Sequence, residues 1–290
     1  MKVQHLSKII HNKEILKDIE FEVETGNIIG IVGRNGAGKT TLLRTMAGIL
    51  SPTKGDVLVE DKSIFEQHKL KEQILFVPDS SEALKNYSTK EILKLYKAIY
   101  PNFDTDYFHA LMGKFALPQV SKIGTYSKGM KALFSIIIAF ATKAHYILLD
   151  EPTDGLDVIV KKQVLQLLVE EVADKERSVI ISSHRLDELE FMANDIIMIK
   201  DGRVDTHYEL DALKSQYIKA QVVFEADMPD ELHEHVTIVA QTGRVYTILL
   251  DRQNEVASNA IHSHSPLLFE ELSLSLEDIF VAKLGGESDV

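Results

Sequence analysis

A glycine-rich stretch, residues 33–40 with the sequence GRNGAGKT, has the residue types and spacing of a phosphate-binding loop. Its glycines permit backbone conformations and close approaches that side chains would block, so backbone N–H groups can surround a polyphosphate. Lys39 can reach the β- and γ-phosphates, and the Thr40 hydroxyl can coordinate Mg²⁺. Residues 28–32 predict a buried strand before the loop, and residues 41–50 predict a helix after it. This context favours a nucleotide site over a flexible surface loop.

Two acidic residues and a histidine follow other strand candidates farther along the chain. Asp150 and Glu151 come directly after the apolar run 146–149, and His184 follows the run 178–182. Parallel strands present functional groups at their carboxyl ends. These three side chains are therefore expected at the same edge of a sheet as the phosphate loop.

The elements that must position these residues alternate between strands and helices up to about residue 205. Such alternation predicts an α/β fold with a parallel sheet that is covered on both faces. The predicted strands are a hairpin that turns near Asn12 and the runs 28–32, 55–64, 73–77, 146–149, 178–182 and 195–200. The predicted helices are 41–50, 128–142, 158–173 and 185–193, with a helical insert at about residues 85–135.

Within the insert, Ser88 and Glu91 have the spacing of a capping box, and Asp104 can start a second helix. The apolar face after the capping box is expected to pack in the interior. Its members are Ile92, Tyr96, Ile99 and Tyr100.

Residues 206–290 differ in character from the rest of the chain and predict a small α+β accessory domain. Strand candidates lie at 218–224 and 245–250, and a last helix at 275–284 is followed by Gly285 and Gly286. A disordered acidic tail is the alternative, but the regular apolar alternation disfavours it.

Composition narrows the possible functions. The chain has no cysteine, which excludes disulfides, thiol nucleophiles and cysteine metal sites. The net charge is −12, and residues 206–290 hold five Lys or Arg against fifteen Asp or Glu, which leaves −2 for residues 1–205. This acidity disfavours a nucleic-acid partner. The first residues lack a signal-peptide pattern, and the apolar run 132–141 is too short to span a bilayer.

Four further motifs follow the phosphate loop in a fixed order: YSKGM at 126–130, ILLDEP at 147–152, GLD at 155–157 and SSH at 182–184. With the loop, this set resembles the nucleotide-binding subunits of ABC transporters over about residues 1–205. The resemblance implies a P-loop NTPase core with a helical subdomain. Its cofactors would be ATP and Mg²⁺.

The resemblance implies a role for each matching residue. Glu151 corresponds to the catalytic carboxylate that polarises the attacking water, and His184 to the histidine that contacts the γ-phosphate. The implied magnesium ligands are Thr40, Asp79 and Asp150. The implied nucleotide-binding residues are Gly33, Asn35, Gly36, Ala37, Gly38, Lys39, Thr40, Thr41, Ile10, Ser127 and Gly129.

Ser127 and Gly129 lie in the YSKGM stretch, which in the family contacts the nucleotide of the opposite subunit. The resemblance therefore implies a head-to-tail dimer that encloses two ATP molecules. The second ATPase subunit could be another copy of this chain or a related chain. Asp157 resembles the residue that links the two sites.

The chain also departs from the family pattern. Asp79 stands where glutamine is usual, and Ile10 stands near the position of the aromatic residue that stacks on adenine. Lys128 and Met130 replace a glycine and a glutamine of the signature, and Val158 replaces a proline. Because Lys39, Asp150, Glu151 and His184 are all retained, we expect ATP hydrolysis.

Residues 267–286, which end in SLEDIFVAKLGG, resemble the C-terminus of ATPase subunits of two-component drug, lantibiotic and peptide exporters, including exporters of phenol-soluble modulins. The implied function is an ATPase that powers a separate membrane permease, held at the inner face of the cell membrane and docked on about residues 85–125. Alternatives are a soluble ABC-type regulator or translation-associated ATPase, and a nucleotide sensor that does not hydrolyse ATP.

Overall fold

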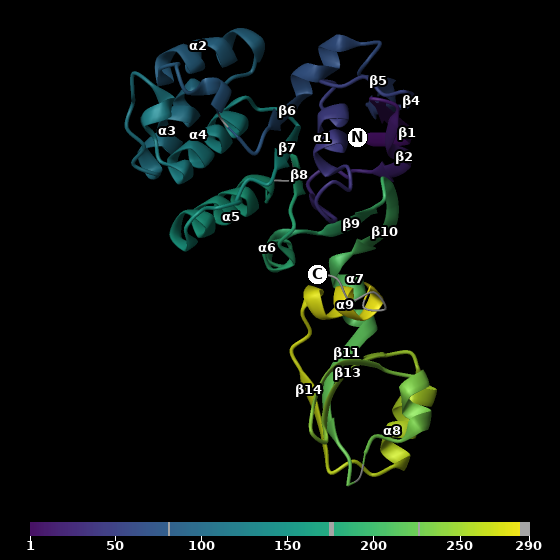
Figure 1. Cartoon of the computed structure of the whole chain (residues 1–290). Helices are drawn as coiled ribbons and strands as arrows, with labels where there is room; N and C mark the ends of the chain where they lie inside the picture. The colour runs from purple at the N-terminus through teal and green to yellow at the C-terminus, as the bar shows by residue number, and fades with distance from the viewer. Residues whose placement is uncertain (81, 174–176, 226, 285–290) are drawn as a thin grey trace. The chain divides into compact units, whose positions relative to one another are not determined.

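The computed structural model describes residues 1–80, 82–173, 177–225 and 227–284, and it divides into two compact units (Figure 1). The first unit comprises Met1–Arg185 and Met192–His207. The second comprises Leu186–Phe191 and the residues from Tyr208 onward.

A six-stranded sheet in the order β10-β9-β3-β8-β7-β6 forms the centre of the first unit. Strand β3 pairs in parallel with β8 and β9, and β7 pairs in parallel with β8 and β6. The predicted parallel sheet is thus confirmed, and the carboxyl ends of β3, β7 and β8 meet at one edge. The strands are β3 (Ile28–Val32), β6 (Ile74–Val77), β7 (Tyr146–Asp150), β8 (Ser178–Ser182), β9 (Asp195–Lys200) and β10 (Arg203–Glu209).

A second, antiparallel sheet of this unit has the order β2-β1-β4-β5, which the sequence analysis did not separate from the parallel sheet. The predicted hairpin is confirmed, because His11 and Asn12 turn with φ values of 48° and 62°. The strands are β1 (Lys2–Ile10), β2 (Lys13–Glu22), β4 (Lys54–Val59) and β5 (Lys62–Ser63).

Helix α1 (Lys39–Met46) packs its apolar face into a core shared by both sheets. Leu42, Leu43 and Met46 are fully buried. The helix is shorter than the predicted 41–50, because Gly48 adopts a left-handed φ of 67° and donates its N–H to the Thr45 carbonyl. A glycine in this conformation commonly ends a helix.

Helices α2 (Thr89–Ile99), α3 (Thr105–Lys114) and α4 (Lys128–Ala141) lie together in the first unit (Figure 1). The capping box is confirmed: the Ser88 hydroxyl accepts from the Glu91 N–H, and the Glu91 carboxylate accepts from the Ser88 N–H. Asp104 caps α3. The expectation for Ile99 is wrong. Its side chain is half exposed at the end of α2, where only the following Tyr100 turns inward and donates to the Ile74 carbonyl.

Helices α5 (Val158–Val172) and α6 (Leu186–Met192) follow β7 and β8. Short 3₁₀ helices complete the regular structure. They are η1 (His68–Gln73), η2 (Glu82–Leu84), η3 (Ile123–Thr125) and, in the second unit, η4 (Asp230–Glu234).

The second unit is built around an antiparallel sheet in the order β12-β13-β11-β14. Alternate residues of β11 and β13, such as Ala220, Val222 and Ile248, form its apolar core with Ile261 of α8. The strands are β11 (Tyr217–Val223), β12 (Thr237–Thr242), β13 (Val245–Asp251) and β14 (Leu268–Leu272). The helices are α7 (Leu210–Gln216), α8 (Glu255–Ser263) and α9 (Leu276–Leu284). Gly285 and Gly286 lie outside the described residues.

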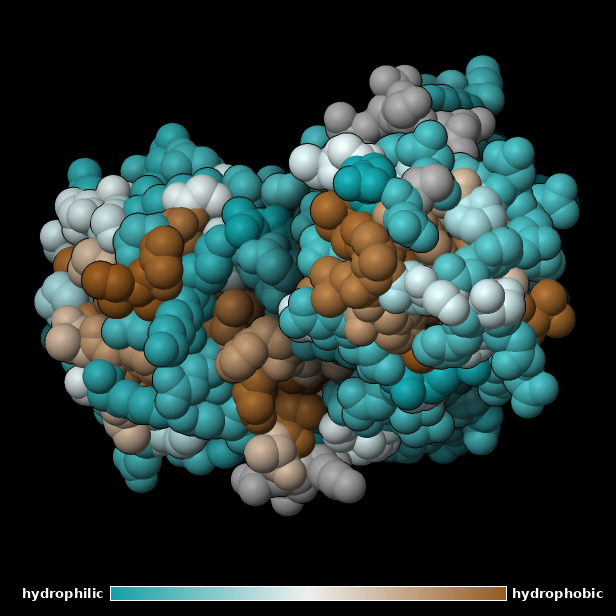
Figure 2. Space-filling view, turned by 90° about the horizontal axis from the view of Figure 1, so that it is seen from below, coloured by the Kyte–Doolittle hydropathy of each residue, from teal (hydrophilic) through white to brown (hydrophobic). Residues whose placement is uncertain are grey.

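The face of the molecule drawn in Figure 2 is mainly hydrophilic, with separate groups of apolar residues. Large apolar side chains are also exposed singly, which is normal for a folded protein. None of the helices that the structure describes is long and apolar enough to cross a membrane.

Candidate nucleotide site

The phosphate loop runs between β3 and α1 and lies directly against neighbouring backbone. A Cβ atom on Gly33 would lie 2.4 Å from the Ile199 carbonyl oxygen of β9. Gly38, with a φ of +108°, lies close to β2, and a Cβ there would be 3.2 Å from the Ile15 carbonyl oxygen. A side chain at Gly33 would displace backbone, and Gly38 is favoured by its left-handed φ and its close approach to β2, so these two glycines are explained by the structure.

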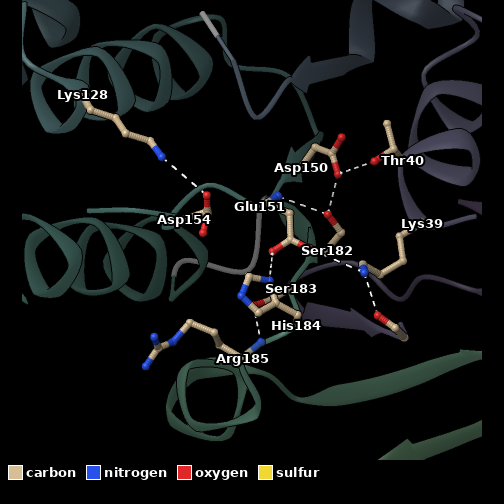
Figure 3. A network of polar contacts seen from close by, with 11 residues as sticks. Lys39, Thr40, Lys128, Asp150, Glu151, Asp154, Ser182, Ser183, His184 and Arg185 are labelled. Atoms are coloured by element: carbon tan, nitrogen blue, oxygen red, sulfur yellow. Dashed lines mark hydrogen bonds and ion pairs between the residues drawn. The ribbon is translucent and has the colours of Figure 1, made fainter. Parts of the chain in front are cut away.

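Lys39 is the first residue of α1, and only 6% of it is exposed. Its Nζ donates to the Gly33 carbonyl at 2.7 Å and lies 3.6 Å from Glu151 Oε1 (Figure 3). An ammonium group has three donors. Lys39 can therefore contact phosphate oxygens in the loop from the floor of the site.

Asp150 is at the carboxyl end of β7 and is almost completely buried. Its Oδ1 accepts from the Thr40 hydroxyl at 3.0 Å and from the Ser182 hydroxyl at 2.7 Å. Thr40 and Asp150 thus bring two oxygen ligands together from different elements. Magnesium usually takes one or two protein oxygens and completes its shell with phosphate oxygens and water. These two residues fit such an ion.

Glu151 has a left-handed φ of 47°, so the chain turns sharply after β7. Its N–H donates to the Ser182 carbonyl at 3.1 Å, which fixes this turn to β8. The side chain then lies between Lys39 and His184, with His184 Nδ1 2.9 Å from Glu151 Oε2 (Figure 3). A carboxylate in this position can orient a water molecule and accept its proton.

The structure therefore brings Lys39, Thr40, Asp150, Glu151 and His184 to one edge of the sheet. Gly36 has a φ of +84°, and a Cβ there would meet no atom within 4 Å. The remaining predicted loop residues lie around the same turn and in the first turn of α1. They are Asn35, Ala37 and Thr41.

Asp79 and Ile10 lie on neighbouring elements. Asp79 is exposed two residues after β6, whose last residue Val77 is paired with Leu149 of β7. Ile10 ends β1 and is partly exposed. The contacts that the structure describes do not test the role of either side chain, so both roles stay predictions.

The predicted signature residues lie at the start of α4. The Ser127 hydroxyl caps this helix by accepting from the Met130 N–H at 3.2 Å. Gly129 lies against α5, because a Cβ there would be 3.0 Å from a methyl group of Val160. Lys128 Nζ is 3.4 Å from an Asp154 carboxylate oxygen, so the start of α4 contacts the loop after Glu151 (Figure 3).

Ser182 belongs to the predicted SSH motif, but the sequence did not predict what its hydroxyl does. Ser182 donates to Asp150 and accepts from the Glu151 N–H at 3.1 Å. The arrangement depends on the register of β7 and β8, which pairs Asp150 with Ser182. The sequence did hold one signal for this contact. Ser182 is a hydroxyl residue at the end of the predicted strand 178–182, as Asp150 is an acidic residue at the end of the predicted strand 146–149.

Three comparisons with known proteins give consistent results. The model of the ABC transporter family matches residues 16–154. The ABC transporter ATP-binding protein YtrB of Bacillus subtilis is 36% identical over 288 residues, which cover 99% of each chain. The bacitracin transport ATP-binding protein BcrA of Bacillus licheniformis is 27% identical, over 99% of this chain and 97% of its own.

A solved structure of an ATP-binding subunit of an ABC transporter has the same fold. It superposes with a TM-score of 0.67 at 25% identity and covers 74% of this chain and 92% of its own. The full-length match to YtrB, together with the phosphate loop and the acidic strand end that meet it, identifies the family. The chain belongs to the ATP-binding proteins of ABC transporters, which are P-loop ATPases.

Proposed function

We propose that this chain binds MgATP and hydrolyses it to power a separate membrane permease. The proposal rests on one observation. Glu151 contacts both Lys39 and His184, and the side-chain oxygens of Thr40 and Asp150 meet beside them. A lysine, a carboxylate, a histidine and two cation ligands arranged in this way can bind a polyphosphate, a cation and an attacking water at the same time.

In the proposed reaction, a water oxygen forms a bond to the γ-phosphorus and the bond from that phosphorus to the β–γ bridging oxygen breaks, which yields ADP and phosphate. Mg²⁺ held by Thr40 and Asp150 would neutralise charge on the β- and γ-phosphates. Lys39 contacts the same phosphates. Glu151 orients the water and accepts its proton, and His184 holds the Glu151 carboxylate and contacts the γ-phosphate.

The active unit in this proposal is a dimer with two nucleotides, in which Ser127 and Gly129 of one subunit complete the site of the other. Their place at the start of α4, a 14-residue helix, supports this role because backbone N–H groups are available there. The partner is a second copy of this chain or a related ATPase.

The permease is the second proposed partner, and its docking surface lies on the helical insert. Tyr87, Leu95 and Ile99 leave large apolar surface exposed there, at 49%, 47% and 50%. Docking would place the chain at the cytoplasmic face of the membrane. The acidity of the chain disfavours nucleic acid as a partner.

The proposed cargo class is amphipathic peptides or drugs, moved outward. Two relatives support it by name: the bacitracin transport protein BcrA and the lantibiotic transport protein SrtF of Streptococcus pyogenes, which is 28% identical over 78% of this chain. Phenol-soluble modulins are amphipathic peptides of this class.

The proposal is tested by the mass of the Glu151→Gln protein with and without MgATP, alongside phosphate release by the unaltered chain. We expect the unaltered chain to release phosphate and the variant to bind ATP without turnover and to double in mass. Equal, background rates of phosphate release in both proteins would contradict hydrolysis and favour a nucleotide sensor. Bound ATP without a mass change would instead indicate that the second ATPase is a different chain.

A further inference from the structure

The start of α4 is joined by an ion pair to the turn that follows Glu151. Lys128 is the first residue of α4, and its Nζ lies 3.4 Å from Asp154 Oδ2 (Figure 3). Asp154 belongs to the turn of Glu151, because its N–H donates to the Glu151 carbonyl at 3.2 Å. The ion pair therefore connects the helix end that carries Ser127 and Gly129 with the backbone of Glu151.

The turn after Glu151 has a shape that receives the lysine. Gly155 adopts a left-handed φ of +62°, and a Cβ there would overlap Lys128 Nζ and lie 3.3 Å from its Cε. The ammonium group thus occupies space that a side chain at position 155 would fill. A second contact of α4 is equally close, because a Cβ on Gly129 would be 3.0 Å from a methyl group of Val160 on α5. The two glycines let α4 approach this turn and α5 closely.

Lys128 also has an electrostatic reason to pair with Asp154. A cation at the N-terminus of a helix is unfavourable, because the first turn carries a partial positive charge. The first turn of α4 has no acidic residue, and the Asp154 carboxylate supplies the opposite charge. The two side chains are 60% and 58% exposed. Since an exposed pair adds little to stability, its removal should leave the chain folded.

We propose that Lys128 and Asp154 are positioning residues that couple the two ATP sites of the dimer. The inference rests on the proposed function, in which Ser127 and Gly129 contact the nucleotide of the opposite subunit. ATP bound there holds the start of α4, and the ion pair transfers this constraint to the turn of Glu151. Occupation of one site therefore favours turnover at the other, so that ATP is hydrolysed cooperatively.

The test measures ATP hydrolysis against ATP concentration for the full-length Lys128→Met, Asp154→Asn and double variants. The unaltered chain should have a Hill coefficient that approaches about 2, because a dimer has two sites. Each variant should lower this coefficient to about 1 and reduce kcat about fivefold. The double variant should lose no more than either single variant, since both remove one contact. The exchanged pair, Lys128→Glu/Asp154→Lys, should restore cooperativity because it rebuilds the contact with reversed charges.

The matched control is Lys143→Met, just beyond the other end of α4. It removes an ion pair of the same length, 3.4 Å to Asp104, together with the contact of the ammonium group over the Tyr107 ring. Its Hill coefficient and kcat should stay unchanged, because this pair does not meet the turn of Glu151. Thermal unfolding of every variant is measured in parallel, because unfolding would reduce the active fraction in all assays.

The inference would be overturned by additive losses, by an equal loss in Lys143→Met, or by an exchanged pair that stays non-cooperative. An active parent chain without cooperativity would overturn it as well. So would a loss in Lys128→Met with none in Asp154→Asn, which would indicate that the lysine contacts phosphate directly. An inactive parent chain would instead overturn the proposed function.

Discussion

At the scale of single residues, the buried carboxylate of Asp150 depends on two hydroxyl groups. One comes from the phosphate loop and one from the next strand, and both donate to the same oxygen. A buried charged group that loses a hydrogen-bond partner is costly, because water cannot replace the partner. Ser182 is therefore expected to support both stability and the geometry of the site.

The Ser182→Ala variant should lower the free energy of unfolding by about 1–3 kcal/mol and should also lower kcat, since Glu151 loses a partner for its N–H. Ser178→Ala is the matched control at the other end of β8. The Ser178 hydroxyl is equally buried and bonds to the Glu24 carbonyl and the Gly26 N–H, far along the strand from Asp150. Denaturant unfolding and phosphate release check both effects. A kcat loss in Ser178→Ala equal to that in Ser182→Ala would contradict the prediction.

The sequence predicted that Lys39, Thr40, Asp150, Glu151 and His184 gather at one edge of the sheet, because each follows an apolar strand or a glycine-rich turn. The contacts among them were not predictable. The Ser182 hydroxyl reaches Asp150 only because β7 and β8 pair in one register, and Lys128 reaches Asp154 only because α4 packs on α5. Such contacts depend on the packing of segments that are distant in the chain.

At the scale of elements, the turn between β9 and β10 fits closely against β2. Gly202 has a φ of +79°, and a Cβ there would lie 2.3 Å from the Ile15 carbonyl oxygen. The Gly202 carbonyl also accepts the Lys17 N–H at 2.7 Å. The same turn therefore joins the parallel sheet to the antiparallel sheet.

The Gly202→Ala variant should lose about 2–4 kcal/mol of stability, since alanine meets both an unfavourable φ and fixed backbone. Gly48→Ala is the control, because Gly48 has a similar φ of +67° but its Cβ would meet only the end of the flexible Lys71 side chain. The Gly48→Ala variant should lose only about 1 kcal/mol of stability. Equal losses in the two variants, measured by denaturant unfolding, would show that crowding by Ile15 is unimportant.

The sequence predicted those helices, turns and caps that depend on residues close together in the chain. The capping box of α2, the hairpin at Asn12 and the helix after Ser275 follow from neighbouring residues. The separation of β1, β2, β4 and β5 into a sheet of their own was not predicted. It depends on the pairing of β1 with β4, which joins Val3 to Val57, and a single sequence holds no direct signal for pairing between segments so far apart.

Asp278, in the first turn of α9, should make the stability of the second unit depend on pH. Burial of Asp278 acts to raise its pKa, but the Lys219 ammonium and the Ser275 hydroxyl and N–H outweigh burial and hold the pKa below its ordinary value. A carboxyl whose folded pKa is depressed stabilises the fold above its unfolded pKa, about 3.9, and that stability is lost as the pH falls through the folded pKa.

The Asp278→Asn variant should therefore be less stable than the parent chain at neutral pH, and the difference should shrink as the pH falls below about 4. Hydrogen exchange of α9, followed between pH 6 and pH 3, measures the effect. Asp227→Asn changes an exposed acid of the same unit and serves as the control. A stability difference that does not change with pH would exclude the proposed link to the Asp278 charge.

At the scale of the whole molecule, the two kinds of assembly should depend on different surfaces. Pairing of two ATPase subunits is proposed at the nucleotide site, whereas the permease is proposed to meet exposed residues of α2. Leu95 and Ile99 lie on that helix, outside the core, at 47% and 50% exposure. Substitution there can therefore separate docking from hydrolysis.

The Leu95→Glu/Ile99→Glu double variant should keep its basal ATP hydrolysis, because neither side chain lies in the site. It should no longer co-purify with an integral membrane protein from native membranes, since burying two carboxylates in an apolar contact is costly. Val256→Glu, at a residue of α8 that is 61% exposed, is the matched control and should still co-purify. Equal recovery of a membrane partner with all three proteins would place docking elsewhere.

The order of strands in the parallel sheet also determines when the site can form during synthesis. The strand that leads into the phosphate loop, β3, lies between β8 and β9, so Ile28 pairs with Val179. A ribosome makes roughly 5–20 residues per second. Strand β3 is therefore synthesised on the order of ten seconds or more before the strands that pair with it. During this interval β3 has neither of its neighbouring strands. The ATP site is also incomplete, so the nascent chain cannot bind ATP there.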